Sequence, residues 1–121
     1  MIQVQVLNRE EVKKFLENKN EEVKKKVSQA MFKASELMRN EVKESIAGRR
    51  NEPTSVDTGR FLNSVDTNIS EDNAIVFTKV EYAQYLEYGT SRMQARRHFN
   101  NSLDRNRNQV VKKFEESIKE I

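Results

Sequence analysis

The stretch NEEVKKKVSQAMFKASELMRNEVKESIAG, residues 20–48, decides the fold class. Its apolar side chains recur three or four residues apart, which places them on one stripe of a helix: Val23, Val27, Ala30, Met31, Ala34, Leu37, Met38, Val42 and Ile46. Asn20 before two glutamates is a helix-start signal, and Gly48 is a stop signal. The opposite face is rich in lysine and glutamate, as expected of a solvated surface. The stretch predicts a long amphipathic helix with one buried face.

Two shorter elements precede this helix. Residues 2–6, IQVQV, alternate apolar and polar side chains, which predicts a short half-buried strand. Asn8 can cap a helix, and Glu11, three residues later, can reach back to the cap. We therefore expect a short helix from about residue 9 and a second helix start at Asn20.

The chain after Gly48 predicts a hairpin. Phe61, Val65 and Ile69 share one parity with small polar residues between them, as on a strand. Residues 70–73, SEDN, predict a turn, and residues 74–80 predict a second strand. The two strands are expected to pair antiparallel.

The last third of the sequence predicts two more helices. Tyr82, Tyr85 and Tyr88 are spaced by three, which favours a short helix around residues 82–88 that ends at Gly89. A basic loop follows, and the helical period returns from His98 with Phe99, Leu103, Val110, Val111, Phe114 and Ile118. The expected fold class is α+β, with a long N-terminal amphipathic helix and a C-terminal helix packed on a small antiparallel β-sheet.

Composition limits the classes of protein that the chain can represent. Its 121 residues suffice for a single domain, 1–121. With 36% hydrophobic and 34% charged residues the core is lean, which suggests support from partner subunits. The net charge of +3 is too small to indicate nucleic-acid binding by itself. Cysteine is absent, and no apolar run is long enough for a membrane span, so no membrane partner is expected. The only proline, Pro53, lies in residues 48–58, which we expect to form an exposed, mobile loop.

No residue pattern indicates catalysis, and we expect no enzyme, cofactor or metal site. The single histidine, His98, follows Arg96 and Arg97, whose charges disfavour imidazolium and metal cations alike. We interpret it as a surface residue at a helix start. Asp57 is expected to make a turn with the backbone near Gly59. A hydrolase or nuclease has no supporting motif.

Arginine is concentrated in two places. Arg92, Arg96, Arg97, Arg105 and Arg107 crowd one segment, and Arg49, Arg50 and Arg60 flank the expected loop. Such clusters can bind phosphates, which keeps open a small DNA-binding module that uses residues 92–107. Arginine and tyrosine are also enriched at protein interfaces. The nearly balanced charge favours the interface.

Two sequence blocks go beyond composition. They read VDTGRFLNSV at residues 56–65 and YAQYLEYGTSRMQARRHF at residues 82–99. Together they resemble the signature blocks of the tail-completion (head–tail joining, or neck) proteins of long-tailed bacteriophages and prophages. The order of expected elements also resembles that of the family. Gln84, Gln94 and His98 stand where family members often carry proline.

The resemblance implies a non-enzymatic virion protein. Such proteins look like ring-forming subunits, commonly six, at the head-proximal end of the tail. They join the head connector to the tail tube and leave a lumen through which DNA passes without sequence-specific binding. The subunit would be made in the host cytoplasm and would be monomeric until assembly, with its loop ordered on docking. We expect Glu87 to pair across subunits with Arg92 or Arg96. The motif residues expected in the assembly region are Asp57, Thr58, Gly59, Arg60, Tyr82, Tyr85, Glu87, Tyr88, Gly89, Thr90, Arg92, Met93, Arg96 and Phe99.

Overall fold

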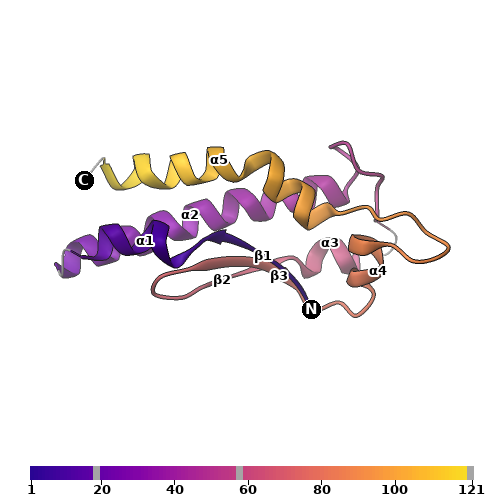
Figure 1. The fold of residues 1–121 in the computed structure, drawn as a ribbon, viewed down its shortest axis with the longest axis horizontal. Coiled ribbons are helices and arrows are strands. Elements are labelled where there is room, and N and C mark those ends of the chain that lie inside the picture. The colour runs from indigo at the N-terminus through magenta and orange to yellow at the C-terminus, as the bar shows by residue number, and fades with distance from the viewer. Residues whose placement is uncertain (18–19, 57–58, 120–121) are drawn as a thin grey trace.

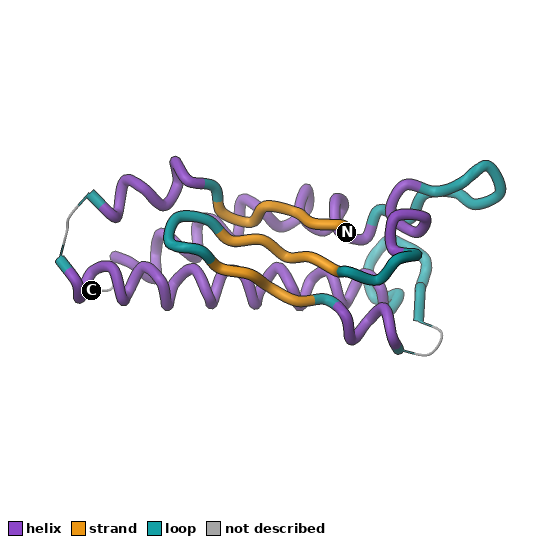
Figure 2. Tube along the Cα trace, turned by 90° about the horizontal axis from the view of Figure 1, so that it is seen from below, coloured by secondary structure: helices purple, strands orange, loops and turns teal. Residues whose placement is uncertain are grey.

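Helix α2, Glu21–Ile46, runs along most of the long axis of the molecule (Figure 1). The computed structural model describes residues 1–17, 20–56 and 59–119. Helix α5, His98–Lys119, lies beside α2, and the sheet covers the opposite side of the core (Figures 1 and 2). This confirms the expected α+β class. The elements are β1 (Ile2–Leu7), α1 (Arg9–Leu16), α2 (Glu21–Ile46), α3 (Arg60–Ser64), β2 (Asp66–Ile69), β3 (Ala74–Thr78), α4 (Ala83–Tyr88) and α5 (His98–Lys119).

Both predicted helix starts are confirmed by their caps. The Asn8 side chain accepts a hydrogen bond from the Glu11 backbone N–H at 3.0 Å, and the Glu11 carboxylate accepts from the Asn8 N–H at 3.3 Å. The Asn20 side chain accepts from the Glu22 N–H at 2.9 Å. These bonds satisfy backbone donors that a helix leaves unpaired in its first turn.

The sheet has three antiparallel strands in the order β1-β3-β2. Val4 of β1 and Thr67 of β2 both pair with Val76 of the central strand. One face of the sheet is buried under α2 and α5 and the other faces away from them (Figure 2). The predicted strand at residues 2–6 and the hairpin turn at residues 70–73 are confirmed, and β1 and β2 are the two edges.

The strand predicted from Phe61 to Ile69 is wrong in its first half. Residues 60–64 form helix α3, and only Asp66–Ile69 is a strand. The four-residue spacing of Phe61, Val65 and Ile69 fits a helical stripe as well as strand parity, so the period could not separate them. Gly59 begins the helix, and its carbonyl accepts from the Asn63 N–H at 2.9 Å.

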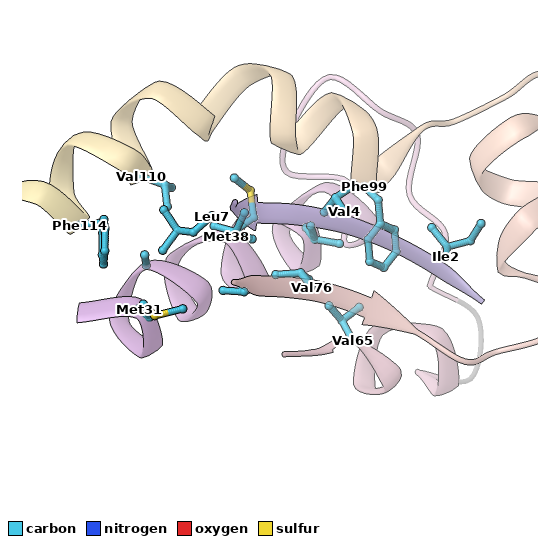
Figure 3. Packing of buried hydrophobic residues seen from close by; sticks show 14 of the residues in the cluster. Ile2, Val4, Leu7, Met31, Met38, Val65, Val76, Phe99, Val110 and Phe114 are labelled. Carbon is cyan, nitrogen blue, oxygen red and sulfur yellow. The ribbon is translucent and has the colours of Figure 1, made fainter. Parts of the chain in front are cut away.

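The core lies between the two long helices and the sheet (Figure 3). Met31 and Met38 of α2 lie on one side of it, and Phe99, Val110 and Phe114 reach in from α5 (Figure 3). The predicted stripe of α2 is buried except for Val23, which is half-buried, and Leu37, which is 43% exposed. The stripe therefore positions α5, whose N-terminus meets the two sequence blocks.

Candidate functional site

The two sequence blocks meet at the end of the molecule that carries α3 and α4 (Figure 1). Phe61 of the first block packs against Tyr82, with ring centroids 6.0 Å apart. It also contacts His98 at 6.1 Å and Phe99 at 6.4 Å. Phe61 and Phe99 are buried, so this aromatic cluster packs the two blocks together beneath their exposed residues.

The first block contributes local structure. Gly59 adopts a φ of 84° at the start of α3, a conformation that side-chain-bearing residues rarely take. The Arg60 guanidinium donates to both carboxylate oxygens of Glu81, at 3.1 and 2.9 Å, and lies 5.6 Å from the centre of the Tyr82 ring. Two further expected residues, Asp57 and Thr58, lie outside the described residues.

The three tyrosines separate into two roles on the predicted short helix, which is confirmed as α4. Tyr82 is half-buried against Phe61. Tyr85 and Tyr88 are 51% and 65% exposed. Aromatic side chains of this kind are common anchors at protein interfaces because they bury a large area at a small entropic cost. Tyr85 and Tyr88 are therefore the tyrosines available for a partner.

The expected pairing of Glu87 across subunits is wrong for this fold, because Glu87 is buried at 1% exposure. Its carboxylate accepts from the backbone N–H groups of Phe99 and Asn100, both at 2.9 Å, and from the Asn100 side chain at 2.7 Å. These donors lie in the first turn of α5, where a negative charge also meets the positive end of the helix dipole. Glu87 thus fastens α4 to α5.

A projecting loop, residues 90–97, follows α4 and extends beyond the body of the molecule (Figures 1 and 2). A Cβ added to Gly89 would lie 2.7 Å from the Ala95 N and 2.8 Å from the Met93 O, so only glycine fits there. The Thr90 N–H donates to the Met93 O at 2.8 Å, and the Arg96 N–H donates to the Leu86 O at 2.8 Å. These bonds hold the loop, which contains no proline.

His98 is not the surface residue that its neighbours predicted. Its side chain is fully buried between α2 and the segment after Gly48. Ser45 Oγ lies 2.8 Å from Nδ1, and Ser55 Oγ lies 2.7 Å from Nε2. The backbone turns at Arg97, whose φ is 52°; Arg97 is exposed, and Arg96 is half-buried beside Ser55.

The bonds around His98 form one directional relay. The Ser45 hydroxyl donates to the Glu52 carboxylate, which can only accept. Ser45 Oγ then accepts from Nδ1–H, and the neutral Nε2 accepts from the Ser55 hydroxyl. Arg96 donates to Ser55 Oγ at 2.8 Å. The relay, Arg96–Ser55–His98–Ser45–Glu52, joins α2, the following segment and α5.

The expectation of an exposed loop at residues 48–58 is wrong for Glu52 and Ser55. Glu52 is 6% exposed and receives two hydrogen bonds from Arg105, at 2.6 and 2.8 Å, and one from Asn101. The Ser55 N–H donates to the Ile46 O at 2.8 Å. Polar residues gave no sign of burial here, because the partners that satisfy them lie on α2 and α5.

The electrostatics of the relay follow from burial and pairing. Burial lowers the pKa of His98 to about 4; the Glu52 carboxylate opposes this shift, and Arg96 and Arg105 add to it. Burial by itself would raise the pKa of the Glu52 carboxyl, but the hydrogen bonds from Arg105, Ser45 and Asn101 outweigh it and lower the pKa to about 2. At neutral pH the relay holds a neutral imidazole and an ionised carboxylate.

Acid is expected to weaken the fold through His98. An unfolded chain binds a proton at this imidazole near pH 6.5, whereas the folded chain does so only near pH 4. The neutral imidazole should therefore make its full contribution to the free energy of unfolding above pH 6.5. This contribution should be lost as the pH falls from 6.5 towards 4, with a slope approaching about 1.4 kcal/mol per pH unit. Urea unfolding at pH 7.5, 6 and 5 measures this. His98→Gln removes the only histidine and should flatten the slope above pH 5; an unchanged slope would contradict the assignment.

Most of the crowded arginines have acidic partners within the chain. Arg105 pairs with Glu52, Arg107 with Glu11, and Arg50 with Glu41. Arg96 donates to the Thr54 carbonyl at 2.7 Å, and Arg97 lies 3.8 Å from Asp104. The guanidinium of Arg92, on the projecting loop, has no hydrogen-bond or ion-pair partner among the described residues. Most of these arginines thus stabilise the fold through contacts within the chain. This weakens the case for a phosphate-binding surface.

Across residues 1–17, 20–56 and 59–119, no group of three or more acidic, histidine or cysteine side chains could hold a metal ion. None of the helices in that part of the chain is both long and apolar enough to cross a membrane.

Residues 10–89, well over half of the chain, match the model of a protein family described as "Bacteriophage HK97-gp10, putative tail-component". The chain belongs to the HK97-gp10-like family. Membership makes it a bacteriophage tail component and confirms the resemblance that the two blocks carry. The family match contains the whole first block and reaches Gly89 of the second, so the projecting loop and α5 lie beyond it. No curated protein and no solved structure matches the chain.

Sequence reasoning missed the relay of this family member. Ser45, Glu52 and Ser55 belong to no motif, and His98 lies 53 residues from Ser45 along the chain. The local sequence contained no signal for it, because the arginines before His98 predicted an exposed side chain.

Proposed function

We propose that this tail component is a head–tail joining, or tail-completion, subunit that assembles as a ring between the head connector and the tail tube. It would lie in the virion neck, at the head-proximal end of the tail, with DNA passing through the lumen without sequence-specific contacts. Membership of the family supports the general role of a phage tail component. The observation that supports the specific one is the end of the molecule at which both blocks meet and present Tyr85, Tyr88 and Arg92 on a rigid base.

The role is proposed to be non-enzymatic. The relay places Ser55 beside His98 in the order of a hydrolytic triad, and the alternative function is therefore a hydrolase with Ser55 as the nucleophile. A base with a pKa of about 4 accepts protons poorly at neutral pH, and Arg96 also donates to the same serine oxygen. Both features support a structural relay. Absence of Ser55 labelling by a fluorophosphonate would agree with this, and labelling would contradict it.

The joining role predicts the effect of removing the exposed tyrosines. Tyr85→Ala and Tyr88→Ala should each weaken binding to connector or tail-tube protein, by about 30-fold if each is a hot-spot residue. Phages with both substitutions should accumulate filled heads and separate tails, which electron microscopy can count.

Leu37→Ala provides the matched control, since Leu37 is also an exposed apolar side chain, at 43%, and belongs to neither block. It should leave joining unchanged. Normal joining by the doubly substituted phage, with the subunit still folded by circular dichroism, would reject the proposed contact.

A further inference from the structure

A groove lies between α2 and the end of the edge strand β2, away from the two blocks. It has a volume of about 630 Å³ and is lined by Ser28, Gln29, Phe32, Lys33, Ile69, Ser70 and Glu71. Phe32 stands in the middle of α2 and is 55% exposed, although the rest of that face is polar. A large apolar side chain beside an open groove is typical of a contact surface.

The strand beside the groove is also open to a partner. In the described sheet β2 pairs only with β3, so no strand pairs with its other edge, where the Thr67 N–H donates to Asp66 Oδ1 at 2.8 Å. Such an edge offers backbone donors and acceptors to an extended segment of another chain. The groove therefore offers both an apolar floor and a hydrogen-bonding edge.

The projecting loop carries an arginine that can pair with a carboxylate at the groove. It extends from the opposite end of the molecule from the turn at residues 70–73 (Figures 1 and 2). It carries the half-buried Met93 and the unpaired, exposed Arg92. Glu71 at the groove is exposed and has no ion-pair partner among the described residues. Glu71 can therefore pair with Arg92, beside the exposed Lys33 of the same groove, which also has no ion-pair partner among the described residues.

We infer that the groove binds the projecting loop of a second copy of this chain. Met93 would lie against Phe32 and Ile69, and Arg92 would pair with Glu71. Lys33 also lines the groove, but its long side chain can keep its ammonium in solvent. A contact between two different surfaces of identical chains is the kind that a closed ring requires. The inference rests on the proposed ring and names the two surfaces that would form it.

Exchange of the two charges tests the pairing. Arg92→Glu and Glu71→Arg should each raise the concentration needed for self-assembly with tail-tube protein by about tenfold or more, because like charges then face each other. The double variant restores opposite charges and should assemble within about threefold of the unsubstituted chain. Glu116→Arg, an exposed reversal on α5, is the control and should change little. Additive losses in the double variant would overturn the pairing.

Cross-linking identifies the occupant directly, since the chain has no cysteine. Ser70→Cys, labelled with a benzophenone maleimide and irradiated in the assembly, should cross-link to residues 90–97 of another copy, as read by mass spectrometry. Asn40→Cys, exposed elsewhere on α2, is the control. Cross-links to connector or tail-tube protein would assign the groove to that partner. They would overturn the inference and leave the proposed joining function standing. Failure of the unsubstituted chain to associate with any of these would overturn the proposed function as well.

Discussion

Glu52→Gln is expected to lower the free energy of unfolding by roughly 2–3 kcal/mol at neutral pH. The substitution keeps the size of the side chain but removes the charge that Arg105 meets with two hydrogen bonds. Loss of one partner of a buried pair costs more than the pair itself contributes, because the other charge stays without compensation. The loss should stay below the largest values for buried pairs, because the Arg105 side chain is 29% exposed and water can partly solvate its unpaired charge. Urea unfolding measures the difference.

Glu44→Gln is the matched control for Glu52. Glu44 also lies near the end of α2 and pairs with an arginine, but that partner, Arg49, has a side chain that is 71% exposed. Exposed pairs contribute about 0–1 kcal/mol, so this variant should be close to the unsubstituted protein. Equal effects of the two substitutions would show that the relay does not stabilise the fold.

The pH dependence supplies a second measurement on Glu52. In the folded chain its carboxyl holds its proton only below about pH 2, whereas in an unfolded chain it does so near pH 4.5. It therefore contributes stability above pH 4.5, and this is lost as the pH falls from 4.5 towards 2. Glu52→Gln should remove that part of the acid dependence and leave the part above pH 5, which belongs to His98.

Glu87→Gln is expected to cost roughly 3 kcal/mol of stability and to loosen the start of α5. The carboxylate receives three donors, two of them backbone N–H groups that no other partner satisfies in the first turn. A glutamine offers one acceptor oxygen and turns an amide donor towards these groups. Hydrogen exchange of the Phe99 and Asn100 amides should become faster together with the loss of stability.

Glu116→Gln, on the exposed side of the same helix, provides the comparison for Glu87. It should change neither the stability nor the exchange of the first-turn amides. Unchanged exchange at Phe99 in Glu87→Gln would contradict the role of Glu87 as the fastening between α4 and α5.

The difference between the elements predicted well and those predicted poorly has a local cause. Helix starts at Asn8 and Asn20 and the helix stop at Gly89 depend on neighbours within a few residues, and each is confirmed. The segment from Phe61 to Ile69 is a counter-example, because a spacing of four residues fits both the helical period and the alternation of a strand. Its helical half depends on Gly59 and on burial of Phe61 against residues of the second block.

The candidate site shows the same division between local and distant causes. The sequence by itself determined the α+β class, the order of the elements apart from α3, the end of α4 at Gly89, and the family that residues 10–89 match. Only the tertiary structure decided which charged and polar side chains are buried. Glu52, Glu87 and His98 are all surface types by composition, yet each is enclosed by partners from distant parts of the chain. Burial of a polar group is stable only where such partners meet, and that meeting is set by the packing of α2 and α5 rather than by any local pattern.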